Sequence, residues 1–309
     1  MNQNVVGKMI QNMEKVIVGK KEVMELAVIT LLAGGHLLLE DVPGVGKTTL
    51  AKTLAKTVGC GFSRIQFTPD TLPSDVTGVS MYRAQTESFE YLKGSVMNQV
   101  ILADEINRAS PKTQASLLEA MEEKQVTVDG QTHQLPSPFM LIATQNPIDY
   151  LGTYHLPEAQ LDRFLMKLSV GYPKHDEELA MIGKFLGTDP WKVIPCVTSA
   201  EEILEMQKEV KQVQIKADLV EYALKIIEST REEETVRLGA SPRATLALIS
   251  SAKSAAFVAG RDYVIPDDIK RVASPVLSHR LVLTPEAKAG KMTAEKIILA
   301  ILARVHVPV

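Results

Sequence analysis

The sequence predicts an α/β fold, in which a mostly parallel β-sheet is flanked by helices and followed by a smaller helical domain. Short apolar runs alternate with helical patterns through the first half of the chain. Several of these runs are apolar throughout, which is typical of parallel strands buried on both faces. Alternation of strands and helices favours a sheet with helices on its faces. The predicted strands are residues 36–39, 63–67, 99–103, 139–144 and 164–170.

The predicted helices have recognisable start signals. Ser110 and Pro111 are suited to the N-cap and first position of a helix that runs to Glu123. Ser199 and Glu202 have the spacing of a capping box at the start of another helix. Further apolar patterns of helical period predict the remaining helices. Besides the helix at 111–123, the predicted helices are residues 1–15, 48–58, 199–210 (the helix with the capping box), 219–231, 242–260, 266–276 and 285–302.

Strand signals stop after about residue 178, and this change predicts two domains. We expect an α/β domain over residues 1–175 and a helical domain over residues 176–309. The hinge between them is placed between Gly171 and Pro195.

Two segments interrupt the strand–helix rhythm and are interpreted as insertions into the α/β domain. Residues 68–98 are rich in Pro, Gly, Ser and Thr and contain only short strand-like pieces. Residues 125–135 alternate around Asp129 and Gly130, a strong signal for a two-residue hairpin turn.

Composition narrows the class of protein. The chain has 34 Lys and Arg residues against 37 Asp and Glu residues and 5% aromatic residues, so no nucleic-acid partner is expected. Cys60 and Cys196 fit no paired framework, which favours a reducing, cytoplasmic setting. The most apolar run, Leu26–Leu39, contains two glycines and a histidine and is too short to span a bilayer. No membrane span is therefore expected.

A glycine-rich turn between a predicted strand and a predicted helix has the pattern of a phosphate-binding loop. Its glycines allow backbone N–H groups to face phosphate oxygens, and the following helix N-terminus favours an anion. Lys47 can reach the β- and γ-phosphates, and the hydroxyl of Thr48 can ligate Mg²⁺. The general pattern has glycine where this chain has Asp41, a departure that bears on nucleotide affinity. The predicted phosphate-binding residues are Pro43, Gly44, Val45, Gly46, Lys47, Thr48 and Thr49.

Carboxylates follow the apolar strand in QVILADEINRA. We assign Asp104 to the metal, because a carboxylate at a strand end can hold Mg²⁺, and Glu105 to polarising the attacking water. The next strand ends at Asn146, whose neutral amide can position that water and sense the γ-phosphate. These residues predict ATP and Mg²⁺ as cofactors and ATP hydrolysis as the reaction.

Six motifs, in this order, resemble those of the MoxR family of AAA+ ATPases, and the likeness spans nearly the whole chain. They are VIVGK (16–20), EDVPGVGKTTLAK (40–52), ILADEINRA (101–109), IATQNP (142–147), LPEAQLDRF (156–164) and GASPRA (239–244). The resemblance implies a P-loop AAA+ sheet domain with a C-terminal helical lid.

The resemblance also implies roles for residues that local chemistry does not assign. Arg163 resembles the arginine finger that points into the nucleotide site of a neighbouring subunit, and Arg108 is a further candidate for crossing that boundary. Arg243 resembles the sensor on the helical lid, which is expected to close on ATP between the two domains. Val18 and Gly19 resemble the segment that packs on adenine.

The implied assembly is a homo-hexameric ring with a chaperone-like role. Similar insertions in related AAA+ proteins form hairpins that face the central opening, so residues 68–98 and 125–135 are candidates for contacting a client protein. The family commonly works with a von Willebrand A-domain partner, and the sequence itself names no client.

Other readings fit less well. A signalling GTPase would use Asp75 of DVTG, but no Asn-Lys-x-Asp motif follows, and we take Asp75 as a loop residue. A small-molecule kinase would not explain Glu105, Asn146 and a separate lid together, and the charge balance disfavours a DNA motor. A nucleotide-switched assembly scaffold with little turnover stays open, although Glu105 and Arg163 favour hydrolysis.

Overall fold

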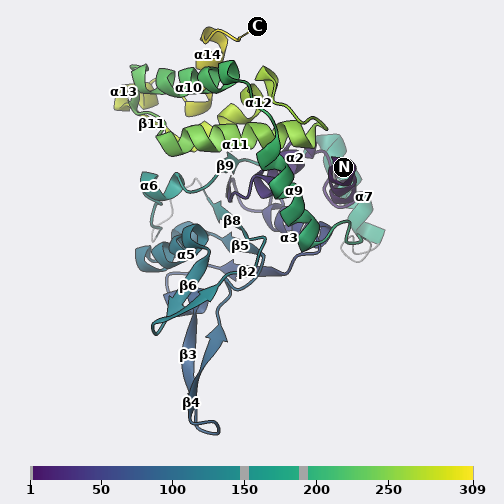
Figure 1. The fold of residues 1–309 in the computed structure, drawn as a ribbon, viewed down its shortest axis with the longest axis vertical. Helices are drawn as coiled ribbons and strands as arrows, with labels where there is room; N and C mark the ends of the chain where they lie inside the picture. The colour runs from purple at the N-terminus through teal and green to yellow at the C-terminus, as the bar shows by residue number, and fades with distance from the viewer. Residues whose placement is uncertain (1–2, 147–152, 188–193, 309) are drawn as a thin grey trace.

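A five-stranded parallel sheet forms the centre of the molecule (Figure 1). The computed structural model describes residues 3–146, 153–187 and 194–308. The strand order is β2-β5-β8-β1-β9, so the chain crosses from β1 to β2 at the edge, returns through β5 and β8, and passes β1 to reach β9. This confirms the predicted α/β fold. The strands are β1 (Leu37–Glu40), β2 (Phe62–Gln66), β5 (Val100–Asp104), β8 (Met140–Gln145) and β9 (Met166–Leu168).

Alternate residues of the central strands face two different cores, which explains why the strands are apolar throughout. Leu37 and Leu39 of β1 belong to a core shared with the helices of one face. Leu38, between them, belongs to a second core on the other face. The first core takes in α1 (Gln3–Glu14), α2 (Lys21–Leu32) and α3 (Lys47–Thr57), and the second takes in α5 (Pro111–Glu123).

Both segments predicted as insertions hold a two-stranded antiparallel ribbon. The first contains α4 (Pro73–Thr77), β3 (Gly78–Arg83) and β4 (Ser88–Lys93), and its hairpin projects away from the sheet (Figure 1). Asp75 lies in α4 rather than in a loop, and its carboxylate accepts a hydrogen bond of 2.9 Å from Leu72 N. The second ribbon pairs β6 (Gln125–Val128) with β7 (Gln131–Gln134) around a turn at which Asp129 and Gly130 have positive φ.

The second half of the chain is mainly helical but contains one short antiparallel ribbon that the sequence did not indicate. Strands of two or three residues carry too little periodicity to be recognised. The elements are α6 (Glu158–Leu161), α7 (His175–Gly187), α9 (Ala200–Gln212), α10 (Ala217–Glu232), β10 (Val236–Leu238), α11 (Pro242–Val258), α12 (Pro266–Leu277), the 3₁₀ turn η2 (Ser278–Arg280) and β11 (Val282–Leu283), then α13 (Pro285–Ala289) and α14 (Ala294–Arg304). The last two replace the single helix predicted over 285–302, because Lys291 has a φ of +56° and Thr293 caps a new helix.

The helical half docks directly on the helices of the sheet domain. Ser254 Oγ of α11 donates to Ile29 O of α2 at 2.8 Å, and Gln207 Nε2 of α9 donates to Leu31 O at 2.7 Å. The capping box at Ser199, predicted for α9, is present. Helix α7 occupies the stretch predicted as a hinge. In the described part of the chain, no helix has both the length and the apolar character needed to cross a bilayer.

Candidate nucleotide site

The phosphate-binding loop follows β1 and leads into α3, as the sequence predicted. Gly44 and Gly46 have φ values of +87° and +93°, a region in which glycine carries no steric cost. Helix α3 begins at Lys47, so its first N–H groups face the loop. A cavity of about 290 Å³ opens here. It is lined by Pro43, Gly44, Gly46, Lys47, Thr48, Asp104, Glu105, Thr144, Gln145 and Asn146.

Lys47 points back along the loop toward its base. Its Nζ donates to the backbone carbonyls of Asp41 at 2.6 Å and Val42 at 3.1 Å. Burial lowers the pKa of Lys47, while Asp41, Asp104 and Glu105 act in the opposite direction. The lysine therefore lies within the electrostatic reach of the predicted catalytic carboxylates.

Asp41 connects the base of the loop to the exit of β9. Its carboxylate accepts hydrogen bonds from Val42 N at 2.9 Å, Ser169 Oγ at 2.9 Å and Gly171 N at 2.6 Å. Burial alone would raise the pKa of Asp41, but these donors, together with the backbone N–H of Val170, outweigh it, and the pKa lies below its ordinary value. The departure from glycine thus adds a link between two segments that bound the nucleotide site.

Asp41→Asn should lower the free energy of unfolding at neutral pH by about 1–3 kcal/mol, because charge-assisted bonds are lost. An ionised group with a lowered pKa contributes stability above its unfolded pKa and loses it as the pH falls through the folded value. The difference between the two proteins should therefore shrink in acid. Denaturant titrations at neutral and acid pH, with Asp70→Asn as the exposed control, measure it. Equal stability at neutral pH would show that the link is not stabilising.

Asp104, the predicted metal ligand, is held by neighbours on both adjacent strands. Thr144 Oγ1 of β8 donates to Asp104 Oδ1 at 2.6 Å. Arg64 of β2 donates to Oδ2 through Nη2 at 2.6 Å and Nε at 3.1 Å. The sequence did not indicate either partner, because each becomes a neighbour only through strand order and register.

Glu105, the predicted base, has a backbone conformation that non-glycine residues seldom adopt. Its φ is +58° and its N–H donates to Thr144 Oγ1 at 2.9 Å. Such strain is kept where the surrounding structure enforces it, commonly at functional sites. Glu105 Oε2 accepts a hydrogen bond of 2.9 Å from Nη1 of Arg108, the last residue of the 3₁₀ turn η1 (Ile106–Arg108). Arg108 thus contacts its own chain's candidate base.

A second, more apolar cavity of about 330 Å³ adjoins the first. Val18, Val45 and Thr49, which are predicted nucleotide contacts, are among the residues that line it. Gly19 lies against the Glu177 side chain of α7, so a side chain at this position would collide with a wall of the cavity. An apolar slot beside a phosphate-binding loop suits a nucleobase. The lining residues are Val16, Ile17, Val18, Lys20, Val23, Gly44, Val45, Gly46, Thr49, Leu50, Val170, Tyr172, Pro173, Glu177, Glu178 and Met181.

Arg163 and Arg243 lie together at a different place. Arg163 Nε is 2.8 Å from Glu122 Oε2, Arg163 Nη1 donates to Leu118 O at 3.0 Å, and Arg243 pairs with the other oxygen of Glu122. Neither arginine is among the described residues that line the two nucleotide cavities. Arg243 therefore lies away from both cavities in this structure, and its role as a sensor stays a prediction. The cause is the docking of α11 on α2, which places the start of α11 near α5.

The residues around the first cavity fit a magnesium–nucleotide complex. The glycine conformations and the start of α3 direct N–H groups to an anion, and Lys47 supplies a cation. Thr48 and Asp104 line the same cavity and offer hydroxyl and carboxylate oxygens, the ligand types that Mg²⁺ prefers. When bound there, Mg²⁺ would neutralise charge on the β- and γ-phosphates.

A phosphate-binding loop after a parallel strand, with acidic residues at the end of β5, which lies one strand further along the same sheet, defines the class of P-loop ATPases. A family model described as "ATPase family associated with various cellular activities (AAA)" matches residues 36–166, and an AAA lid domain model matches residues 228–301.

Comparisons over the whole chain specify the family. The chain is 44% identical to Chaperone MoxR1 of Mycobacterium tuberculosis, covering 96% of this chain and 80% of the relative. It is 51% identical to the uncharacterized protein YeaC of Bacillus subtilis, over 99% of this chain and 95% of the relative. A solved structure from Cytophaga hutchinsonii, described as an ATPase, superposes with a TM-score of 0.93 at 40% identity, covering 99% and 96%. The chain belongs to the MoxR family of AAA+ ATPases.

Proposed function

We propose that this ATPase of chaperone type binds Mg²⁺-ATP at the two adjoining cavities and hydrolyses it in a ring, in which each site is completed by a neighbouring subunit. The observation that carries the proposal is the placement of Arg163. It lies outside both nucleotide cavities of its own chain, with 31% of its side chain exposed. An arginine finger in that position can contact a nucleotide only if the nucleotide is bound to a second subunit packed against it.

Each predicted residue has a role in this scheme. Lys47 and the loop backbone hold the phosphates, while Thr48 and Asp104 hold the metal. Glu105 polarises the attacking water, and Asn146, which lines the same cavity, orients it. Arg163 and Arg243 together contact the neighbour's γ-phosphate, since both extend from Glu122 into one cavity.

A head-to-tail interface between identical subunits generates a closed ring when its rotation closes. By family resemblance we propose a homo-hexamer. Residues 1–175 would form the sheet domain and residues 176–309 the helical lid.

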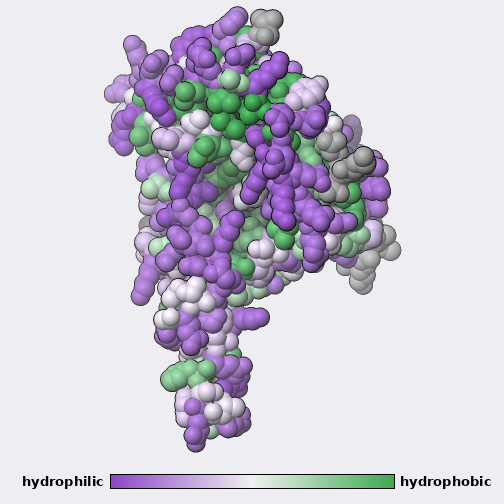
Figure 2. All heavy atoms as spheres, viewed as in Figure 1, coloured by the Kyte–Doolittle hydropathy of each residue, from purple (hydrophilic) through white to green (hydrophobic). Residues whose placement is uncertain are grey.

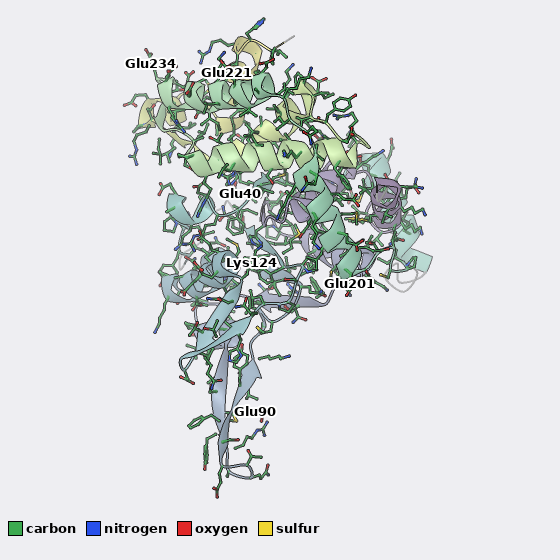
Figure 3. The ribbon with its side chains drawn as sticks, viewed as in Figure 1. Glu40, Glu90, Lys124, Glu201, Glu221 and Glu234 are labelled. Atoms are coloured by element: carbon green, nitrogen blue, oxygen red, sulfur yellow. The ribbon has the colours of Figure 1, made fainter. Side chains whose placement is uncertain are left out.

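The projecting β3–β4 hairpin is the proposed contact with a client protein. Figure 2 shows it as a mostly polar arm with smaller apolar patches. Met81, Tyr82 and Phe89 are exposed on it, Phe89 to 74%. Glu90, labelled on this arm in Figure 3, pairs with Arg83 at 2.6 Å across the two strands. Exposed aromatic residues on a projecting ribbon suit contacts with proteins. A von Willebrand A-domain protein is the partner class suggested by the family resemblance.

The experiment that tests this function measures ATP turnover per subunit against protein concentration, together with the mass of the assembly. A rate per subunit that rises with concentration and levels off as a ring forms is expected. A flat rate from a monomer would refute the shared site. Assembly on ATP with negligible turnover would instead support a nucleotide-switched scaffold.

A further inference from the structure

The segment that carries Arg163 is held by an arginine of the helical half of the chain. This finger segment (Asp162–Leu165) connects α6 with β9. Arg280 Nη2 donates to Asp162 O at 3.0 Å and to Phe164 O at 2.7 Å, and Nη1 donates to Leu165 O at 3.2 Å. Arg280 Nε donates to Asp162 Oδ1 at 2.7 Å. One guanidinium thus holds both ends of the finger segment.

Arg280 is almost completely buried, with only 3% of its side chain exposed. A buried charge is tolerated when an opposite charge and several hydrogen bonds satisfy it, as Asp162 and the carbonyls do here. The planar fork of arginine can contact several acceptors in fixed directions, which the ammonium group of lysine cannot reproduce. The contact therefore depends on the planar geometry of the guanidinium as well as on its charge.

The Asp162 carboxylate that pairs with Arg280 also connects the finger segment to the start of α11, and these side chains form one cluster. Asp162 Oδ2 accepts from Ser241 Oγ at 3.0 Å, and Ser241 is the N-cap of the helix that carries Arg243. Asp162, Arg163, Arg243 and Arg280 all line one cavity of about 330 Å³. A displacement of the helical half would thus move both ends of this cluster together.

We propose that Arg280 is a positioning residue, which aims Arg163 at the neighbouring subunit's nucleotide and transmits the position of the helical half to it. Arg280 itself contacts no nucleotide. The inference rests on the proposed function, because it assigns Arg280 a role only through Arg163. It goes beyond the arginine finger by naming what orients the finger.

The test uses Arg280→Lys, which keeps the charge and removes the planar fork. Turnover of the assembled variant should fall roughly 10- to 100-fold, because small misplacements of a catalytic group cost rates of that order. ATP affinity per subunit should stay at the wild-type value. Arg261→Lys is the matched control, since Arg261 makes a two-point ion pair with Asp268 in the same half of the chain, at 2.8 and 2.6 Å. Thermal unfolding of both variants reports any loss of fold.

Mixing variants separates positioning from general damage. A Glu105→Gln subunit lacks its own base but offers an intact finger, so it should restore turnover at the intact site of an Arg280→Lys neighbour. In rings assembled at random from equal amounts, about one quarter of the interfaces combine the two correctly, and the rate should approach that share of the wild-type rate. Arg163→Ala mixed with Glu105→Gln is the positive control.

The outcomes are distinguishable. The positioning role is supported if mixing with Glu105→Gln restores the turnover of Arg280→Lys. Arg261→Lys should be active by itself and gain no turnover from the same mixing. Restoration for Arg163→Ala but not for Arg280→Lys overturns it and leaves the proposed function intact. Failure of both mixtures overturns the shared site and the positioning role together. A loss of turnover in Arg261→Lys equal to that in Arg280→Lys overturns the positioning role by showing general damage to the helical half.

Discussion

Replacing Arg163 with alanine is expected to lower ATP turnover of the assembled protein by roughly 10³–10⁵-fold, the range measured for arginine fingers. The guanidinium neutralises charge that develops on the transferred phosphoryl group, and in the proposed site Arg243 beside it does not replace the lost finger. ATP binding should be nearly unchanged. The loss of its ion pair with Glu122 should affect folding little, because both side chains are about one-third exposed, at 31% and 33%.

Steady-state turnover at a concentration that maintains the ring measures this effect. Arg304→Ala is a suitable control, because Arg304 is an exposed arginine that pairs with Glu233 at 3.3 Å and lines neither the two candidate nucleotide cavities nor the cavity of Arg163. Turnover of Arg163→Ala within a few-fold of wild type would remove Arg163 from the site.

The second large effect is expected for Glu105→Gln, which should bind ATP normally and hydrolyse it about 10²–10⁴-fold more slowly. Glutamine keeps the size of the side chain and can still accept from Arg108, but an amide is a poor base. The strained backbone at this position is preserved by the Thr144 contact to the Glu105 N–H.

Single-turnover hydrolysis and fluorescent-nucleotide binding separate chemistry from affinity. Glu119→Gln, an exposed change on α5, serves as the control. Wild-type hydrolysis by Glu105→Gln would show that another group activates the water. A proportional loss of binding would show that Glu105 acts on affinity instead.

The first cavity, beside the phosphate-binding loop, was predictable because its signals are local. The glycines, Lys47 and Thr48 occur together in one turn, and Asp104 ends an apolar run whose character identifies a buried strand. Helix α5 was predicted with the bounds that the structure has, since Ser110 and Pro111 mark its start.

The supporting contacts were not predictable because each depends on distant segments. Thr144 and Arg64 reach Asp104 only through strand order, and Arg280 reaches the finger segment across 118 positions of sequence. The place of Arg243 depends on how the helical half docks on α2, which no local pattern encodes.

The sharing of Glu122 by two arginines has a thermodynamic consequence. One carboxylate neutralises Arg163 through one oxygen and Arg243 through the other. If an anion binds one arginine and breaks its ion pair with Glu122, the other arginine interacts with a less neutralised carboxylate and is bound to it more strongly. An anion that binds both arginines must compete with this one carboxylate. The two arginines are thus linked ligands of one group, and their responses to a neighbour's phosphate are coupled rather than independent.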